Sequence, residues 1–303
     1  MFTVNTPLPQ FPENSFAELA PQADGSLAPR PDPDDPPWGL PVAVVVWVVS
    51  FLLLAFVPAF ALLGYIAYTG QPLNDETLNH VLKNDPNGIL TSVAAVIPTH
   101  LLTIALAWAV VTGLGRRPFR QTLGWSFGGG FGLWTSAALA GALLFFGTVV
   151  LRFVGGDATD IDQIINSSTA ARFTMAFLAV ATAPLVEELI YRGVLYPAMQ
   201  RAMGALWAVV GVSTLFALVH YYQYRNNLGV LGVITLLSFA LTIVRAKTGR
   251  LLPCFVIHTV FNGFQSLYLV LQHFRPELFE AEASRQGLLL CAGALARSLG
   301  LHV

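Results

Sequence analysis

Two adjacent carboxylates stand inside an apolar stretch of the chain, at Glu187 and Glu188, and Arg192 follows one helical turn later. A charged side chain at mid-bilayer costs about 2.5–3.5 kcal/mol even on lenient scales, so acids inside a membrane span usually have a function. Neighbouring residues of a helix point about 100° apart, so the two glutamates face different directions. Glu188 lies four residues before Arg192, the favourable order for an ion pair within a helix. We therefore expect Glu188 and Arg192 to form a structural pair and Glu187 to be free for chemistry.

A histidine in the next apolar segment lies at the same depth as Glu187. If the helix that carries Glu187 turns at Met203 and Gly204, Glu187 lies 16 residues before the turn and His220 lies 16 residues after it. Both side chains then stand about 24 Å from the turn, at a rise of about 1.5 Å per residue. They can face each other across two antiparallel helices, with Phe216 one turn before His220 on the same face.

A second pair of polar side chains, His258 and Asn262, lies in the last strongly apolar segment. The two residues are four positions apart and share one face of a helix. A single histidine or asparagine in a membrane helix is often only a hydrogen bond between helices, and we interpret His100, which has no polar companion in the sequence, in that way. His258 and Asn262, in contrast, can converge with Glu187 and His220 in one cavity. An unpaired glutamate in such a cavity is costly unless it has a function.

The composition is that of a protein that lies in a bilayer. Of the 303 residues, 55% are hydrophobic and 11% are charged, whereas soluble globular domains carry about 25% charged residues. The formal net charge of −1 gives no indication of nucleic-acid binding. The two cysteines, Cys254 and Cys291, are too few for a disulfide framework.

The apolar segments predict an all-α, polytopic membrane helix bundle with seven to eight transmembrane helices. A helix needs roughly 20 apolar residues to cross a bilayer. The seven expected spans are 42–67, 89–111, 131–151, 173–186 with a continuation to about 202, 205–219, 230–244 and 251–271. An eighth candidate, 287–301, either spans the membrane or lies in its interface. Before this transmembrane domain of residues 39–303, we expect a disordered tail at 1–38, which is rich in proline and acids.

The positions of Lys and Arg predict the orientation of the bundle. Short cytoplasmic loops carry an excess of basic residues. The alternate loops that are rich in them contain Arg116, Arg117, Arg120, Arg201, Arg245, Lys247 and Arg250. These loops fall on the same side of the membrane as the N-terminus. We therefore predict a multi-pass protein of the cell membrane, surrounded by lipid, with its N-terminus in the cytoplasm.

Three polar motifs follow one another on successive apolar helices: Glu-Glu-x-x-x-Arg, Phe-x-x-x-His and His-x-x-x-Asn. In this order they resemble the motifs of the CAAX prenyl endopeptidase and bacteriocin-processing (CPBP) family of intramembrane endopeptidases. The basic Thr-Gly turn in residues 245–253 is similar to that family as well. The resemblance covers about residues 173–265, which it identifies as the catalytic core. It implies a CAAX-type glutamic endopeptidase, a hydrolase that cleaves a peptide or protein substrate within the membrane.

The resemblance also implies roles for the residues of the first motif. Glu187 matches the general base, and Glu188 with Arg192 matches a pair that supports it. Proton abstraction from water by a positioned carboxylate is ordinary general-base catalysis. The resemblance thus divides the two glutamates in the same way as the helix geometry does.

For the other two motifs, the resemblance implies that His220 positions or activates the water and that His258 and Asn262 stabilise the oxyanion. Imidazole and amide donors are suited to that task in a site of low dielectric. Zinc is the alternative, because Glu187, His220 and His258 could supply the three protein ligands that zinc hydrolases commonly use. The chain has no His-Glu-x-x-His motif, the usual helical arrangement of a zinc peptidase. We favour a site with no metal and no other cofactor.

Two functions other than proteolysis are alternatives for these residues. Intramembrane acids and histidines also mark ion paths in transporters, but the paired halves of secondary transporters have no counterpart in residues 42–153. A non-catalytic scaffold or immunity protein on the same fold would not need all six motif residues. The sequence does not select the substrate, a peptide or protein that is membrane-anchored or prenylated in some of the alternatives: a prenylated CAAX tail, a leader peptide and a signalling peptide stay open. It does not define the oligomeric state.

Overall fold

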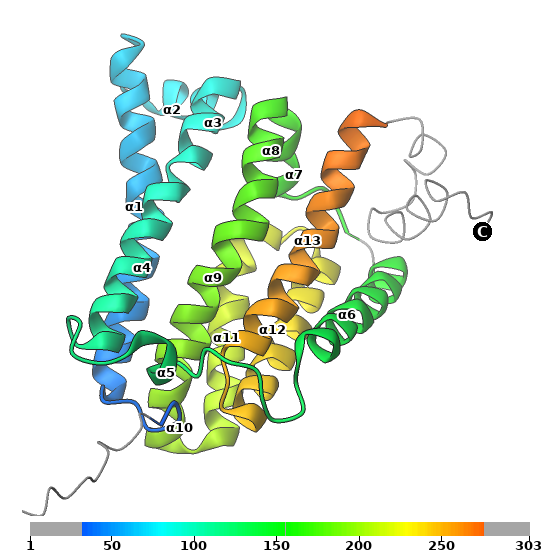
Figure 1. Cartoon of the computed structure of the whole chain (residues 1–303). Helices are drawn as coiled ribbons and strands as arrows, with labels where there is room; N and C mark the ends of the chain where they lie inside the picture. The colour runs from blue at the N-terminus through cyan, green and yellow to red at the C-terminus, as the bar shows by residue number, and fades with distance from the viewer. Residues whose placement is uncertain (1–31, 155, 276–303) are drawn as a thin grey trace, which may run out of the picture. The chain divides into compact units, whose positions relative to one another are not determined.

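The computed structural model describes residues 32–154 and 156–275, and these residues are mainly helical. Within this part of the chain there is no β-strand, only an isolated bridge between Gly128 and Phe131. Seven helical stretches among the described residues are long and apolar enough to cross a bilayer (Figure 1). The fold is therefore the all-α, multi-pass bundle that the composition predicts.

The seven spans confirm the number and order of the apolar segments. In chain order, the first three spans are α1 (Leu40–Tyr68), α3 together with α4 (Pro86–Ala94 and Val96–Thr112), and α6 (Leu133–Val154). The fourth span is composite (Thr169–Met203), and the last three are α11 (Ala205–Tyr224), α12 (Leu228–Thr248) and α13 (Leu252–Phe274). Most of them extend a few residues beyond the apolar segments at one or both ends. The eighth candidate, residues 287–301, lies outside the described residues.

Short helices lie at both ends of the bundle. α2 (Asp75–Lys83) and α7 (Asp160–Ser167) lie toward one end, and α5 (Phe119–Thr122) lies toward the other (Figure 1). The first two begin at capped positions, because the side chains of Asn74 and Thr159 accept hydrogen bonds from backbone N–H groups of the first turn. These caps end the connecting loops at defined points.

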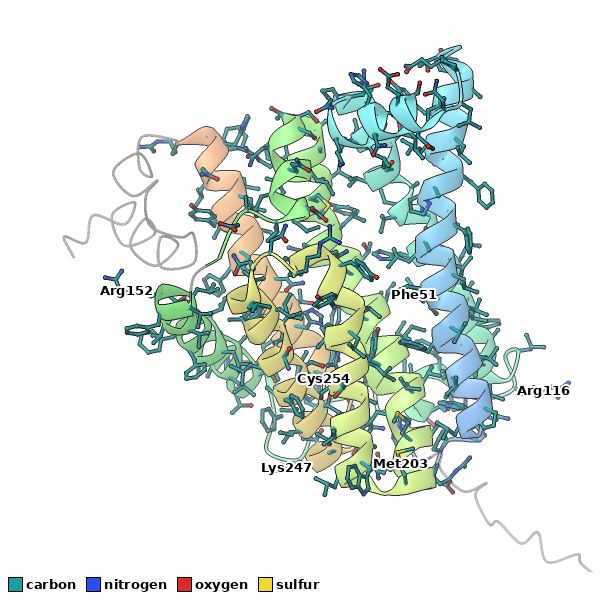
Figure 2. All side chains as sticks on the ribbon, turned by 180° about the vertical axis from the view of Figure 1, so that it is seen from behind. Phe51, Arg116, Arg152, Met203, Lys247 and Cys254 are labelled. Atoms are coloured by element: carbon teal, nitrogen blue, oxygen red, sulfur yellow. The ribbon has the colours of Figure 1, made fainter. Side chains whose placement is uncertain are left out.

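The basic loop residues Arg116 and Lys247 lie at the end of the bundle where α1 begins (Figure 2). Met203, at the turn that follows the fourth span, lies at the same end (Figure 2). This arrangement agrees with the alternation of spans on which the orientation was predicted. Which side of the membrane this end faces stays a prediction.

The chain enters α1 through a short segment, residues 32–38, which the sequence assigns to the disordered tail. In the structure this segment contacts the bundle, because Asp35 pairs with Arg201 at 3.1 Å and Asp34 pairs with Arg245 at 2.6 Å. Trp38 is buried there and its indole N–H donates to the Val194 carbonyl. The rest of the expected tail, residues 1–31, lies outside the described residues.

The fourth span is a chain of helical pieces and not one regular α-helix. The pieces are α8 (Thr169–Phe177), η1 (Leu178–Thr182), α9 (Ala183–Glu187), η2 (Glu188–Leu195) and α10 (Tyr196–Met203), of which η1 and η2 are π-helical. Wide π turns are rare and frequently occur at functional sites. Each of them is followed at the second residue by a proline, Pro184 or Pro197, which has no backbone N–H. The span ends at Gly204, with φ +84°, at the turn expected from the sequence.

Two large apolar clusters, beside two small ones, hold the described part of the bundle together. One contains residues of α1, α4, the second half of the fourth span and α11, and the other contains residues of α6, α12 and α13. Residues 188–199 of the fourth span are buried at every position, as expected for a helix that is packed on all sides. Polar side chains of the fourth span meet both α12 and α13, because Arg192 contacts Ser238 and Glu188 contacts His258.

Candidate active site

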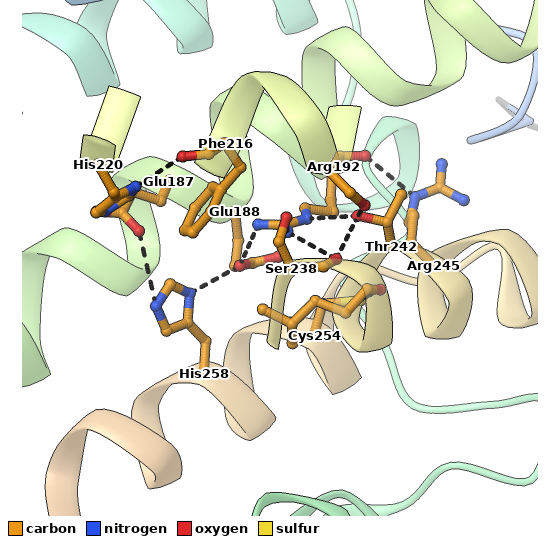
Figure 3. A network of polar contacts seen from close by, with 12 residues as sticks. Glu187, Glu188, Arg192, Phe216, His220, Ser238, Thr242, Arg245, Cys254 and His258 are labelled. Atoms are coloured by element: carbon orange, nitrogen blue, oxygen red, sulfur yellow. Dashed lines mark hydrogen bonds and ion pairs between the residues drawn. The ribbon is translucent and has the colours of Figure 1, made fainter. Parts of the chain in front are cut away.

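A buried ion pair joins Glu188 to Arg192, as the spacing of four residues predicts. Arg192 Nη1 lies 3.0 Å from Glu188 Oε1, and neither side chain has any exposed surface. The other guanidinium nitrogens donate to α12: Nη2 to Ser238 Oγ at 2.7 Å and Nε to Thr242 Oγ1 at 3.2 Å (Figure 3). The ring of Phe216 lies against the guanidinium, with its centroid 4.7 Å from Cζ. The guanidinium thus has the additional hydrogen bonds that a buried ion pair requires, whereas Glu188 Oε2 is buried without a hydrogen-bond partner.

His258 connects the two glutamates. Its Nδ1 lies 2.8 Å from Glu188 Oε1 and its Nε2 lies 3.6 Å from Glu187 Oε2 (Figure 3). The His258 side chain is 3% exposed and the Glu187 side chain is 25% exposed. Glu188 is buried and its Oε1 contacts both His258 and Arg192, so Glu187 is the carboxylate of this network that retains access to the surroundings. This division between the two acids is the one expected from the sequence.

His220 is joined to the network through Phe216. Its Nδ1 lies 2.7 Å from the Phe216 carbonyl oxygen, which can only accept a hydrogen bond, so Nδ1 carries a proton. In a neutral ring Nε2 is then an acceptor. The Phe216 ring lies between the two histidines, with its centroid 4.6 Å from that of His220 and 6.1 Å from that of His258. Phe216 is therefore the packing partner that His220, His258 and Arg192 share.

Asn262 has a different partner from the other motif residues. Its Nδ2 donates to the Ala179 carbonyl in η1 at 3.0 Å, one turn along α13 from His258. A second contact to η1 comes from α4, where His100 Nδ1 lies 2.8 Å from Thr182 Oγ1. The sequence gives His100 no companion, because Thr182 is an ordinary helix residue until the fold brings the two spans together. Both contacts fix the π turn that leads into Glu187.

Residues 169–264 match the family Type II CAAX prenyl endopeptidase Rce1-like. The matched stretch contains all six predicted site residues and confirms the resemblance read from the three motifs. It covers about a third of the chain and begins where the fourth span begins. No curated protein and no solved structure matches the chain. The match with this family suggests a protease that works in the membrane.

Within this Rce1-like stretch, the structure adds a residue that sequence reasoning assigned to a basic loop. Arg245 Nε donates to the carbonyl oxygen of Arg192 at 3.2 Å, and the Arg245 side chain is 1% exposed (Figure 3). Ser238 and Thr242, which hold the Arg192 guanidinium, were also missed. Both are small polar residues in an apolar span, and such residues often make interhelical hydrogen bonds, but nothing in their spacing indicates which partner they meet.

The geometry of this site also bears on the zinc alternative. Among the described residues, no group of three or more His, Cys, Asp or Glu side chains is arranged to hold a metal ion. His258 directs Nδ1 to Glu188 and His220 directs Nδ1 to the Phe216 carbonyl, an orientation that zinc-ligating histidines also adopt. Because Glu187, His220 and His258 are not gathered as a metal centre in this structure, we derive no chemical step through one. Metal dependence stays a prediction.

Proposed function

We propose that this protein is an intramembrane endopeptidase in which Glu187 activates the water that attacks the peptide bond. The observation that carries the proposal is the unequal environment of the two acids. Glu188 is buried and held by Arg192 and His258, whereas Glu187 is partly exposed and lies 3.6 Å from His258 Nε2. A general base must reach both water and substrate, and in this network Glu187 is the acid that can.

In the proposed reaction Glu187 takes a proton from water while the water oxygen attacks the carbonyl carbon of the scissile bond. The electron pair of the carbonyl moves to its oxygen, and the resulting oxyanion needs a preorganised donor. Glu187 then returns the proton to the leaving nitrogen as the C–N bond breaks. The products are a new carboxyl terminus and a new amine, so one water is consumed and Glu187 is regenerated.

Glu188 supports this chemistry through His258. The Nδ1–H of His258 donates to Glu188 Oε1, which holds the ring with Nε2 on the side of Glu187. An imidazolium has a second N–H at Nε2, on the side of Glu187, which can donate to the oxyanion. Arg192 balances the charge of Glu188 whether the His258 ring is neutral or charged. The pair therefore positions His258 and does not itself touch the substrate.

In the proposed mechanism His220 positions the attacking water and Asn262 stabilises the oxyanion. The free Nε2 of His220 can accept a hydrogen bond from the attacking water. The Asn262 amide has two N–H groups, of which one holds the Ala179 carbonyl and the other can reach an oxyanion. Asn262 would then combine anchoring of η1 with the stabilising role implied by the family resemblance.

We propose a membrane-anchored peptide or protein, with a prenylated carboxyl-terminal segment as the leading candidate, as the substrate class. A site between membrane helices favours substrates that are held in the bilayer, and the matched family is described as one of prenyl endopeptidases. We further propose that the protein works in the cell membrane with its N-terminus in the cytoplasm and without a metal cofactor.

The proposal can be tested by comparing the protein termini in membranes that contain the wild type, Glu187→Gln or Glu76→Gln. Glu76 is an exposed acid at the start of α2 and serves as a matched control for the loss of one carboxylate. We expect new termini with the wild type and with Glu76→Gln that are missing with Glu187→Gln. Termini that persist with Glu187→Gln at the wild-type level would contradict the assignment of the base.

A further inference from the structure

The carbonyl of Arg192 has lost both of the backbone donors that a helix can offer. The N–H of Tyr196, four residues later, donates to the Tyr191 carbonyl in the five-residue pattern of the π turn. The donor that this pattern would provide for Arg192 is residue 197, which is Pro197 and has no N–H. A backbone carbonyl in such a buried segment needs another partner, because leaving it unpaired is costly.

Arg245 supplies this partner from the last turn of α12. Its Nε donates to Arg192 O at 3.2 Å, Nη1 pairs with Asp34 Oδ1 at 2.6 Å, and Nη2 donates to the Pro33 carbonyl at 2.8 Å. The ring of Tyr196 lies beside the guanidinium, with its centroid 5.5 Å from Cζ. One buried side chain thus joins the segment before α1 to the backbone of the residue that pairs with Glu188.

The same arrangement occurs at the other π turn. The N–H of Ala183 donates to the Leu178 carbonyl, and the residue five positions after Ala179 is Pro184, so the Ala179 carbonyl lacks both backbone donors. Asn262 Nδ2 donates to it at 3.0 Å. The five residues of α9, which end at Glu187, therefore lie between two π turns whose free carbonyls are each held by a side chain from another helix.

We propose that Arg245 is a positioning residue of the peptidase site, and that Asp34 keeps it in place. By holding the Arg192 carbonyl, Arg245 fixes the wide turn of η2 and with it the direction of the Glu188 and Arg192 side chains toward His258. Arg245 touches none of the groups that the reaction uses, so its effect passes through the backbone. This inference rests on the peptidase function proposed above.

The neighbouring acid, Asp35, offers a matched control. Asp34 balances a guanidinium that is 1% exposed, and a buried charge without its partner is strongly unfavourable. Asp35 pairs with Arg201, where the side chains are 71% and 43% exposed. Exposed ion pairs of this kind contribute little to the free energy of unfolding. The substitutions Asp34→Asn and Asp35→Asn therefore remove the same charge from adjacent residues with different expected consequences.

The experiment compares full-length wild type, Arg245→Gln, Asp34→Asn and Asp35→Asn in lipid nanodiscs. Hydrolysis of an internally quenched, farnesylated peptide ending in a CAAX sequence gives kcat and KM, and hydrogen exchange read by mass spectrometry gives the protection of amides in residues 188–196. For Arg245→Gln we expect kcat to fall at least about tenfold, the factor that loss of one charge-assisted hydrogen bond gives, with KM changed less than about twofold. The kcat of Asp34→Asn should fall by a smaller factor, and the kcat of Asp35→Asn should stay within about twofold of the wild-type value.

Hydrogen exchange separates failure of this inference from failure of the peptidase proposal. Exchange in residues 188–196 should accelerate for Arg245→Gln and Asp34→Asn but not for Asp35→Asn, whether or not the probe peptide is cleaved. A second substitution, Pro197→Ala, restores a backbone N–H for Arg192 and should recover part of the protection, and of kcat, in the Arg245→Gln background. Unchanged exchange in Asp34→Asn and Arg245→Gln would overturn the positioning role. Wild-type activity of Glu187→Gln would overturn the peptidase mechanism alone.

Discussion

Removing Arg192 should destabilise the protein far more than removing an exposed arginine. In Arg192→Ala, the Glu188 carboxylate stays buried with His258 as its remaining partner, and the hydroxyls of Ser238 and Thr242 lose their donor. Breaking a buried pair by deleting one partner costs about 3–5 kcal/mol. For a chain of this size each kcal/mol lowers Tm by about 2–4 °C, so we expect a decrease of about 6–20 °C. Glu188→Ala should give a decrease of the same order.

A thiol-reactive dye provides the assay. Cys254 is fully buried and should react only after unfolding, and a Cys291→Ser background leaves Cys254 as the single thiol of the chain. Arg116→Ala is the control, because Arg116 is exposed in a loop and surface substitutions usually stay within about 0.5 kcal/mol. The decrease of Tm in the double variant Glu188→Ala with Arg192→Ala should be smaller than the sum of the decreases in the two single variants. If both single variants unfold at the wild-type temperature in detergent, the pair is not structural.

The remaining predictions concern metal and pH. Purified active protein should contain far less than one zinc per chain by elemental analysis and keep most activity after prolonged treatment with a strong chelator; stoichiometric zinc that His220→Ala removes together with activity would refute the metal-free mechanism. The prediction about pH concerns the carboxyl group of Asp85. Burial raises its pKa, but hydrogen bonds from the Tyr65 hydroxyl and the backbone of Asn87 and Gly88 outweigh this and leave the pKa below its usual range. The carboxylate therefore contributes stability that is present above its unfolded pKa of about 3.9 and is lost as pH falls through the lower folded value. Asp85→Asn should flatten the fall of Tm with acid, and an unchanged acid limb would exclude this contribution.

The spans and the ion pair could be predicted because they depend on short-range rules. Apolar length locates a membrane helix wherever its neighbours lie, and a spacing of four residues brings Glu188 to Arg192 within a single helix. The depth estimate that related Glu187 to His220 relied only on the helical rise and on the turn at Gly204. Each of these expectations uses one or two elements of the fold.

The two π turns and their partners could not be predicted in this way, since they depend on contacts between spans far apart in the sequence. Pro184 and Pro197 are visible signals, but a proline in a membrane helix is compatible with many local geometries. Arg245 was interpreted only as a basic residue of a loop, because its contact with Arg192 crosses from one span to another. For His100 the sequence predicts a hydrogen bond between helices, which the structure confirms, but its partner Thr182 is identified only in the folded bundle.

The central claim is that Glu187 is the base, and the kcat of Glu187→Gln tests it most directly. The measurement uses purified wild type, Glu187→Gln and the control Glu76→Gln, reconstituted in nanodiscs with the same farnesylated peptide and checked for equal folded fractions by size exclusion. We predict that kcat falls by about 10²–10⁴-fold in Glu187→Gln, the usual contribution of a general base, while the folded fraction and the control stay at the wild-type level. A Glu187→Gln protein that is folded and hydrolyses the peptide at the wild-type rate would contradict the mechanism.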